Sequence, residues 1–419
     1  MSSFSFSRRN KKTATAVAIL AASALVLSGC AAGTADEGRD ADGNLNLLIG
    51  TALPQTGSLA FLGPPEEAGV ALALKDINEA AKGINLTVEW GDSGDLDNKA
   101  YETEIPRLLS AGVKAIIGAA SSGTSLAFID QVVGAGVLQF SPANTSPTLT
   151  TYDDKGLYFR TAPSDLLQGE VLGNLMAADG HQTAAMIVLN DAYGTGLRDA
   201  TQASFEAAGG SIVAAPVFNP GDTNFSAQIS EALAASPDAI VLITFDEAKT
   251  IVPALVSQFP KEKIYFVDGN LADYSEVFEP GTLTGAKGTA PGLDPDTIMD
   301  FLTRMDDNWV AEGNAKLDSY LYGPESYDAV VLIALAALAA DSTNGVLMAG
   351  KLQEVSGGSG SGTKCTSFAE CADIIIGGGV ADYDGISSPV TFDEYGDPTQ
   401  GNILISIYGD DNKITAVKN

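Results

Sequence analysis

The stretch VKAIIGAASSGT at residues 113–124 decides the fold class. Residues 113–119 form a short apolar run with several β-branched side chains, which predicts a strand buried in a sheet. Ser121 opens the next segment, whose apolar residues recur at helical spacing over 126–133. A buried strand followed at once by a helix is the repeating unit of parallel α/β sheets. We therefore expect an α/β fold.

The same unit recurs on both sides of about residue 165. The segment PDAIVL at 237–242 resembles VKAIIG at 113–118, and each precedes a small or polar loop that opens a helix. Two such series predict two doubly wound parallel-sheet lobes, with helices on both faces of each sheet and a ligand cleft between the lobes. Strands are expected at 45–52, 85–90, 113–119, 137–140, 183–189, 211–218, 239–245 and 263–267, and helices at 66–81, 101–111, 126–133, 166–178, 196–208, 225–233 and 250–259.

The C-terminal part mixes both types of element. Residues 327–340 are very apolar. They are too few to span a membrane, for which about 20 apolar residues are needed, so we expect a core helix. Further strands are expected at 389–392, 402–408 and 414–417.

The N-terminus has the parts of a secretory signal. A basic cluster at 8–12 precedes an apolar run at 14–27, and LSGC at 27–30 resembles the bacterial lipobox. This pattern predicts a signal peptide cleaved before Cys30 and a lipid on the Cys30 thiol. The alternative is an ordinary signal with a chance cysteine, and the twin-arginine route stays open beside Sec export. The polar residues that follow predict a flexible tether to the outer face of the membrane.

Charge and cysteine content exclude several classes of function. The formal net charge is −30 at pH 7, and such a surface repels phosphate backbones, so we expect no nucleic-acid binding. Once Cys30 is lipidated, Cys365 and Cys371 are left, and in an oxidising compartment this pair predicts a local disulfide. The only histidine, His181, lies far from both cysteines in sequence, so we expect no metal and no cofactor.

The loops that follow the strands carry the candidate site, because ligands of open parallel sheets bind beyond the carboxyl ends of the strands. Ser121 and Ser122 open a helix whose free N–H groups suit an anion. The loop 141–147 adds the hydroxyl of Thr145. The alternatives for these segments are a capping serine without a ligand and a rigid turn.

The second lobe offers acids and aromatic rings at its strand ends. Tyr193 follows one strand, Phe245 and Asp246 follow another, and Asp268 follows a third. Each acid alone is more often solvated or caps a helix. Together with the donors of the first lobe, these acids would clamp a zwitterion from both sides, which predicts an amino acid as the ligand.

These features together resemble the branched-chain amino-acid-binding family of ABC-transporter receptors, which has the type I periplasmic-binding fold. The resemblance runs from about residue 45 to the end of the chain. It implies two lobes, joined by a three-strand hinge, that close on a ligand and then dock on a membrane permease. It is carried by PQTGSLAFLGP at 54–64, IGAASS at 117–122, GVLQFSP at 136–142, NDAYG at 190–194 and YDGISSPVTFD at 383–393.

The resemblance also implies roles for single residues. Ser122 matches the serine that binds the ligand α-carboxylate. Ala143 and Thr145 match a loop whose carbonyl, amide and hydroxyl groups contact the carboxylate and the ammonium. Tyr193 matches an aromatic residue that closes over the ligand. Asp268 stands where the family has a glutamate that pairs with the ammonium, so the shorter acid needs a shifted ligand or a bridging water.

Several positions depart from the family pattern. Leu62 stands where an aromatic residue often lines the side-chain pocket, and Phe245 and Asp246 stand where tyrosine is common. A carboxylate at Asp246 or Glu247 would favour a polar or cationic ligand side chain over leucine. The branched-chain specificity therefore stays open.

The implied organisation is that of an exported lipoprotein. We expect a monomer, anchored to the outer face of the cell membrane, whose partners are a small ligand and ABC permease subunits. Crossings between the lobes are expected near Ala162, Thr289 and Ser387. The expected parts are a signal peptide at 1–29, a tether at 30–44, a first lobe at 45–162 plus 290–386, and a second lobe at 163–289 plus 387–419.

Two other classes of function compete with this interpretation. An enzyme would need a nucleophile with a base, or a metal, and a sole histidine placed before a strand, with no Gly-x-Ser-x-Gly elbow at a strand end, disfavours it. The alternative to transport is a sensing module for amino acids, amides or small carboxylates that signals through a partner protein. Sensor relatives carry a transmembrane helix and a signalling domain after the lobes.

Overall fold

The first sheet consists of five parallel strands in the order β2-β1-β3-β4-β5. The computed structural model describes residues 38–417, so the predicted signal peptide and Cys30 lie outside the described residues. Strands β3 and β4 are buried along their whole length, as expected for central parallel strands. The five strands are β1 (Leu45–Ala52), β2 (Ile84–Glu89), β3 (Ala115–Gly118), β4 (Leu138–Ser141) and β5 (Tyr158–Arg160).

The second sheet has the order β15-β14-β11-β10-β9-β6-β7, and β8 also pairs with β6. Neighbours from β6 to β11 are parallel, whereas β14 and β15 add an antiparallel edge. The predicted strand at 211–218 is divided into β7 and β8. The strands are β6 (Thr183–Leu189), β7 (Ser211–Ala214), β8 (Val217–Phe218), β9 (Ala239–Ile243), β10 (Ile264–Val267), β11 (Lys287–Pro291), β14 (Ile403–Tyr408) and β15 (Ile414–Ala416).

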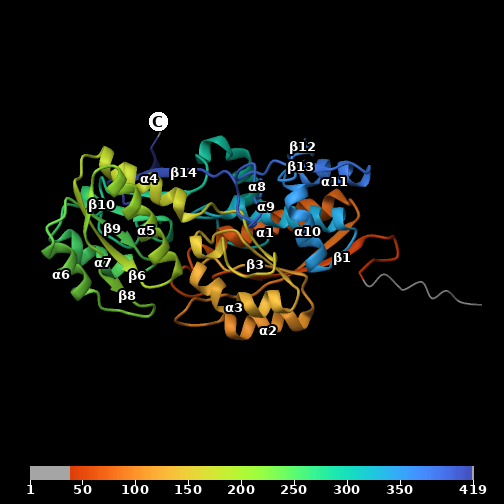
Figure 1. The fold of residues 1–419 in the computed structure, drawn as a ribbon, viewed down its shortest axis with the longest axis horizontal. Helices are drawn as coiled ribbons and strands as arrows, with labels where there is room; N and C mark the ends of the chain where they lie inside the picture. Colours follow the sequence, from red (N-terminus) through yellow and green to blue (C-terminus); the bar gives the residue numbers. More distant parts are fainter. Residues whose placement is uncertain (1–37, 418–419) are drawn as a thin grey trace, which may run out of the picture. The chain divides into compact units, whose positions relative to one another are not determined.

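Helices cover both sheets, and we call each sheet with its helices a lobe (Figure 1). The first lobe has α1 (Gly63–Ala80), α2 (Tyr101–Ala111), α3 (Ser122–Gly134), α8 (Met299–Ala311), α9 (Gly323–Ala340), α10 (Gly345–Val355) and α11 (Phe368–Ile376), with the short strands β12 (Thr363–Cys365) and β13 (Ala381–Tyr383). The second lobe has α4 (Asp165–Ala178), α5 (Ala192–Ala207), α6 (Ser226–Ala234) and α7 (Ala248–Val256).

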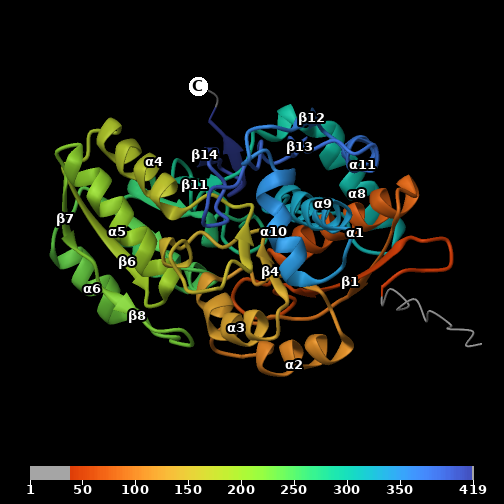
Figure 2. The ribbon, with the colours of Figure 1, turned by 45° about the vertical axis from the view of Figure 1, so that its right-hand side comes forward.

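Helix α9 is the central helix of the first lobe. Figure 2 shows it between α1 and α10, and it packs against both. Among the described residues it is the one helix long and apolar enough to cross a membrane, yet 83% of it is buried inside the protein. The expected core helix is thus confirmed.

The third passage between the lobes lies later in the chain than the sequence suggests. Val390 and Phe392 belong to the first-lobe core, where Phe392 packs on Phe140 and Phe159 at ring-centroid distances of 5.8 and 5.4 Å. The chain joins the second sheet only at β14, beyond the expected crossing at Ser387. The expected strand at 389–392 is not formed, because Val390 has a φ of 43°, which interrupts extended backbone.

The end of the expected flexible tether is folded. Asp40 accepts hydrogen bonds from the backbone N–H of Asn44 at 2.8 Å and from the Asn85 amide at 2.7 Å. Arg39 forms an ion pair with Asp341. Residues 39–44 are therefore fixed to the first lobe by polar contacts that the local composition does not reveal.

The expected disulfide is present. The sulfurs of Cys365 and Cys371 are bonded, which joins β12 to α11 at the edge of the first lobe.

The two lobes touch through apolar side chains. Leu59, Leu62, Ala120, Ala143 and Tyr322 come from first-lobe segments but belong to the same cluster as the core of the second lobe. The carboxyl ends of β3 and β4 face this contact through the loops that follow them, so the strand-end residues of the two lobes meet here.

Candidate functional site

The first-lobe half of the site is the start of α3. Ser121 caps this helix, since its Oγ accepts a hydrogen bond from the Thr124 N–H at 3.3 Å. Ser122 has a different role, since its Oγ accepts hydrogen bonds from the N–H groups of Thr145 and Ser146 at 3.3 and 3.2 Å. A hydroxyl that accepts twice still has its own hydrogen to donate. Ser122 therefore offers a buried donor, as an anion site requires.

The loop after β4 is fixed against the loop after β3. Ser141 Oγ donates to the Ala119 carbonyl at 2.7 Å, and the Asn144 amide donates to the carbonyls of Ala119 and Ala120 at 2.9 and 2.7 Å. Thr145 Oγ1 and the Asp165 carboxyl group are both buried and lie beside each other. A bond from the Thr145 hydroxyl to a ligand would therefore compete with Asp165.

Arg160 of β5 anchors the same loop from the opposite side. Its guanidinium donates to the carbonyls of Asn144 and Ser146 at 3.3 and 2.9 Å and to Thr150 Oγ1 at 2.9 Å. It also forms a two-bond pair with Asp397, at 2.7 and 2.6 Å. All five N–H groups of a guanidinium are thereby used, which explains why an arginine with 0% exposure is tolerated here.

The second-lobe half of the site is built around Asp268, which follows β10. Its Oδ1 accepts from the Gln168 amide at 3.0 Å and from the Tyr193 hydroxyl at 2.7 Å. Its Oδ2 accepts from the hydroxyl of Tyr322, a first-lobe residue, at 2.8 Å. Burial raises the pKa of Asp268, while the three donors favour its charged form. Asp268 is therefore an acid held at the boundary of both lobes.

Two aromatic rings cover this acid. Tyr193 and Phe245 stack at a centroid distance of 5.3 Å and an interplanar angle of 18°, and both are buried. Their side chains come from the loops after β6 and β9, as the strand-end argument predicts.

The predicted residues of both lobes meet at one small cavity. Thr145 lies behind Ser122, and Asp246 lines a neighbouring cavity instead. The small cavity is lined by the predicted Leu62, Ser121, Ser122, Ala143, Tyr193, Phe245 and Asp268, together with Leu59, Ala120, Gly269 and Tyr322.

Sequence reasoning missed three polar residues beside Asp268. Tyr322 and Gln168 donate to it, and the Asp165 carboxyl group is buried near it. Burial, and then the charge of Asp268, raise the pKa of Asp165 well above its usual range. Asp165 and Gln168 lie at the start of α4, after the first passage between the lobes, and Tyr322 immediately precedes α9, so a search restricted to strand ends does not reach them.

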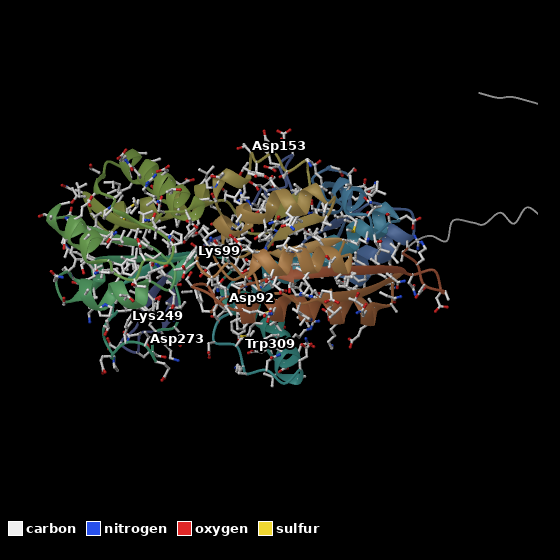
Figure 3. The ribbon with its side chains drawn as sticks, turned by 90° about the horizontal axis from the view of Figure 1, so that it is seen from below. Asp92, Lys99, Asp153, Lys249, Asp273 and Trp309 are labelled. Atoms are coloured by element: carbon white, nitrogen blue, oxygen red, sulfur yellow. A yellow bond between two sulfur atoms is a disulfide. The ribbon has the colours of Figure 1, made fainter. Side chains whose placement is uncertain are left out.

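A second, larger cavity adjoins the first. Ser121 and Phe245 line both, and the larger one, of about 370 Å³, also holds Asp191, Asp246 and Glu247. Asp246 pairs there with Lys249 at 2.5 Å; Figure 3 labels Lys249 on the second lobe. The two cavities are therefore neighbours at the contact between the lobes.

Known proteins of this architecture are similar to the chain in sequence and in structure. Residues 47–369 match the family described as periplasmic binding protein. The chain is 30% identical to Leu/Ile/Val-binding protein homolog 2 of Brucella abortus over 60% of this chain and 69% of that protein. The LivJ structure from Streptococcus pneumoniae, in complex with isoleucine, matches with a TM-score of 0.68 and 21% identity over 89% of this chain and 100% of that one.

A further similar structure shows that the fold serves other ligands. A solute-binding protein from R. palustris, in complex with benzoate, has a TM-score of 0.69 and 17% identity over 89% of this chain and 95% of that one. Fold similarity at this level leaves the ligand to the residues of the cleft. With two α/β lobes, strand-end residues gathered between them and a family match over most of its length, the chain belongs to the periplasmic binding proteins of the type I fold, the group that includes the Leu/Ile/Val-binding receptors of ABC transporters.

Proposed function

We propose that this protein captures an α-amino acid between its lobes and delivers it to an ABC permease. One observation carries the proposal: the donor Ser122 of one lobe lies across a small cavity from the acid Asp268 of the other, and Thr145 is hydrogen-bonded to Ser122. A zwitterionic head group has the complementary pair of charges. The names of similar proteins, which refer to leucine, isoleucine and valine, support the same class of ligand.

Each side of the cavity has a proposed role. The Ser122 and Thr145 hydroxyls donate to the α-carboxylate, and the Ala143 carbonyl and Asp268 receive the ammonium. Because Asp268 already accepts three hydrogen bonds, the ammonium takes the place of one of these donors. A ligand with only a carboxylate would gain nothing from Asp268, which argues against a benzoate-like ligand. Tyr193 and Phe245 cover the bound ligand.

Entry of a ligand requires the lobes to separate. The small cavity is lined by side chains from both lobes and has a volume of only about 10 Å³, and Tyr322 bonds to Asp268 across the contact. Ligand that bridges both half-sites then shifts the population toward the closed form. The proposed hinge consists of the three passages of the chain between the sheets. The proposed lobes keep the limits that the sequence predicts, except that the third passage comes later.

The proposed setting is the outer face of the cell membrane. The lipobox at 27–30 supports export and a lipid on Cys30, with the protein acting as a monomer beside its permease. Cys30→Ala should release the protein from the membrane fraction into the soluble fraction, and retention of the variant would refute the anchor. We propose no catalytic role: His181 contacts Tyr265 at 3.0 Å and does not line the cleft.

A calorimetric and thermal-shift panel of amino acids, amides and small carboxylates tests the proposal. A ligand at 100 times its dissociation constant stabilises the folded protein by about 2.7 kcal/mol. Asp268→Asn should abolish binding of α-amino acids, whereas Asp199→Asn, an exposed acid on α5 of the same lobe, should not change it. No response to any α-amino acid would refute the assignment, and unchanged affinity of the Asp268 variant would remove that residue from the site.

A further inference from the structure

The larger cavity is lined by many acidic side chains. It adjoins the proposed head-group site through Ser121 and Phe245, and its volume of about 370 Å³ lies in the range of small-molecule sites. No Lys or Arg lines it among the described residues. Six acids do: Asp95, Asp97, Asp191, Asp222, Asp246 and Glu247.

Four of these acids have partners within the protein, and a fifth, Asp97, is exposed. Asp95 accepts from the N–H groups of Ser58, Asp97 and Asn98 at 2.8, 2.9 and 2.8 Å, so it organises its own loop. In the same way, the carboxyl groups of Asp222 and Glu247 accept from the backbone N–H groups of Asn219 and Phe245, at 2.8 and 2.7 Å, and Asp246 pairs with Lys249. These acids shape the walls of the cavity.

Asp191 differs from them. Its Oδ1 caps α5 by accepting from the Gly194 N–H at 2.7 Å. Its Oδ2 is buried and, within the described part of the chain, has no hydrogen-bond partner. This oxygen faces the other lobe, since a Cβ added to Gly123 there would be 2.8 Å from it, and Asp191 also lines the cavity. Burial, and then the charge of Glu247, raise the pKa of Asp191 to about 7. A buried carboxylate oxygen without a partner is costly, and a cation beside it would remove that cost.

The rest of the wall is apolar. Its apolar lining consists of Leu96, Leu189, Pro220, Phe225 and Phe245. Methylene groups pack well on such side chains while a charged end reaches polar partners. A bound metal is a poorer fit, because no group of three acids among residues 38–417 is placed to hold one. The cavity therefore suits an aliphatic chain that ends in a cation.

We propose that the ligand is an α-amino acid with a cationic side chain, whose ammonium or guanidinium group pairs with Asp191 in the larger cavity. This proposal rests on the proposed function, since the head group is held by Ser122, Thr145 and Asp268. An aliphatic side chain such as that of leucine would fill part of the cavity and leave Asp191 Oδ2 dry and unpaired. The acid at this place thus selects against the branched-chain ligands.

Matched pairs of ligands test the charge separately from the shape. Lysine and norleucine share a carbon chain and differ in the ammonium, and arginine and citrulline differ in the guanidinium charge. By titration calorimetry, the cationic member of each pair should bind roughly tenfold tighter or more, the increment expected for a hydrogen bond to a buried charge. Raised salt should reduce this ratio less than it would for an exposed pair.

A variant of Asp191 tests whether this residue binds the cationic group. Asp191→Asn keeps an oxygen to cap α5 but removes the charge, so the lysine-to-norleucine ratio should fall to near one while norleucine binding is kept. Asp199→Asn on the same helix should leave the ratio as in the unaltered protein, and thermal melts of both variants show whether they fold. If norleucine or leucine binds as tightly as lysine, or if Asp191→Asn keeps the full ratio, the cationic assignment is overturned while the proposed function stands. If no α-amino acid binds, both are overturned.

Discussion

Replacing Arg160 with methionine should destabilise the protein and weaken its ligand loop together. The guanidinium makes two hydrogen bonds to Asp397 and three to the Asn144 and Ser146 carbonyls and Thr150. Methionine fills similar space but leaves the Asp397 carboxylate, with only 7% exposure, without its counter-charge. Breaking a buried ion pair by removing one partner costs about 3–5 kcal/mol, so the free energy of unfolding should fall by about this amount.

Urea titrations followed by circular dichroism measure the change, and a double variant isolates its cause. Arg160→Met with Asp397→Leu removes the stranded charge, so it should be more stable than Arg160→Met alone. Arg160→Lys keeps a charge but has three donors instead of five and no planar fork for the carboxylate, so it should lie between the unaltered protein and Arg160→Met. A loss of less than about 1 kcal/mol in Arg160→Met, the range of exposed pairs, would refute the reasoning.

Three further predictions concern the covalent link, the charge and the contact between lobes. Changing Cys365 and Cys371 to serine should cost about 2 kcal/mol in thermal or urea unfolding, the loop-closure entropy expected for a separation of 6 residues, and an unchanged midpoint would contradict this. Asp191 should release its proton near pH 7 in the folded protein but near pH 4 in the unfolded chain, so the folded protein binds more protons between these two values. The free energy of unfolding should therefore fall as pH rises through this window, by at most about 4 kcal/mol. Urea titrations at several pH values should show that Asp191→Asn lacks this part of the pH dependence. Tyr322→Phe removes a bond to the charged Asp268, worth about 1.5–3 kcal/mol, and should shift the ligand-free protein toward the open form, visible as a longer distance between dyes placed on the two lobes.

Elements with a clear hydrophobic pattern in their own sequence were predictable to the residue. β1, α2 and β6 have the expected limits, although β1 and β6 pair with strands that are distant in the chain. β5 was missed because it has only three residues and ends on a charged one. Arg160 is buried there only because Asp397 supplies its counter-charge from 237 positions away, and no local pattern reports such a partner.

The residues of the candidate site also differ in how far the sequence predicts them. Ser122 and Asp268 were predictable since the end of a parallel strand points to the cleft whatever the rest of the chain does. Tyr322 was not, because it stands just before the first residue of α9, where its φ of 63° is uncommon for a residue other than glycine. Its contact with Asp268 exists only once the two lobes are placed against each other, which periodicity within a lobe does not specify.

We infer that the proposed hinge and the proposed carboxylate side of the site are linked through Arg160. Arg160 precedes the first passage between lobes and Asp397 lies just before the third, so their ion pair fixes these two segments side by side on the first lobe. Gly401 and Pro163 continue the contact, since a Cβ at Gly401 would lie 2.6 Å from that of Pro163. The guanidinium that makes this pair also holds the loop of Thr145. In the proposed opening, the donors for the carboxylate therefore stay in place, while Asp268 moves away with the second lobe and loses its bond to Tyr322. Selection for the ammonium and the side chain of the ligand then takes place during closure of the lobes, because the acids that bind these groups reach the ligand only as the lobes meet.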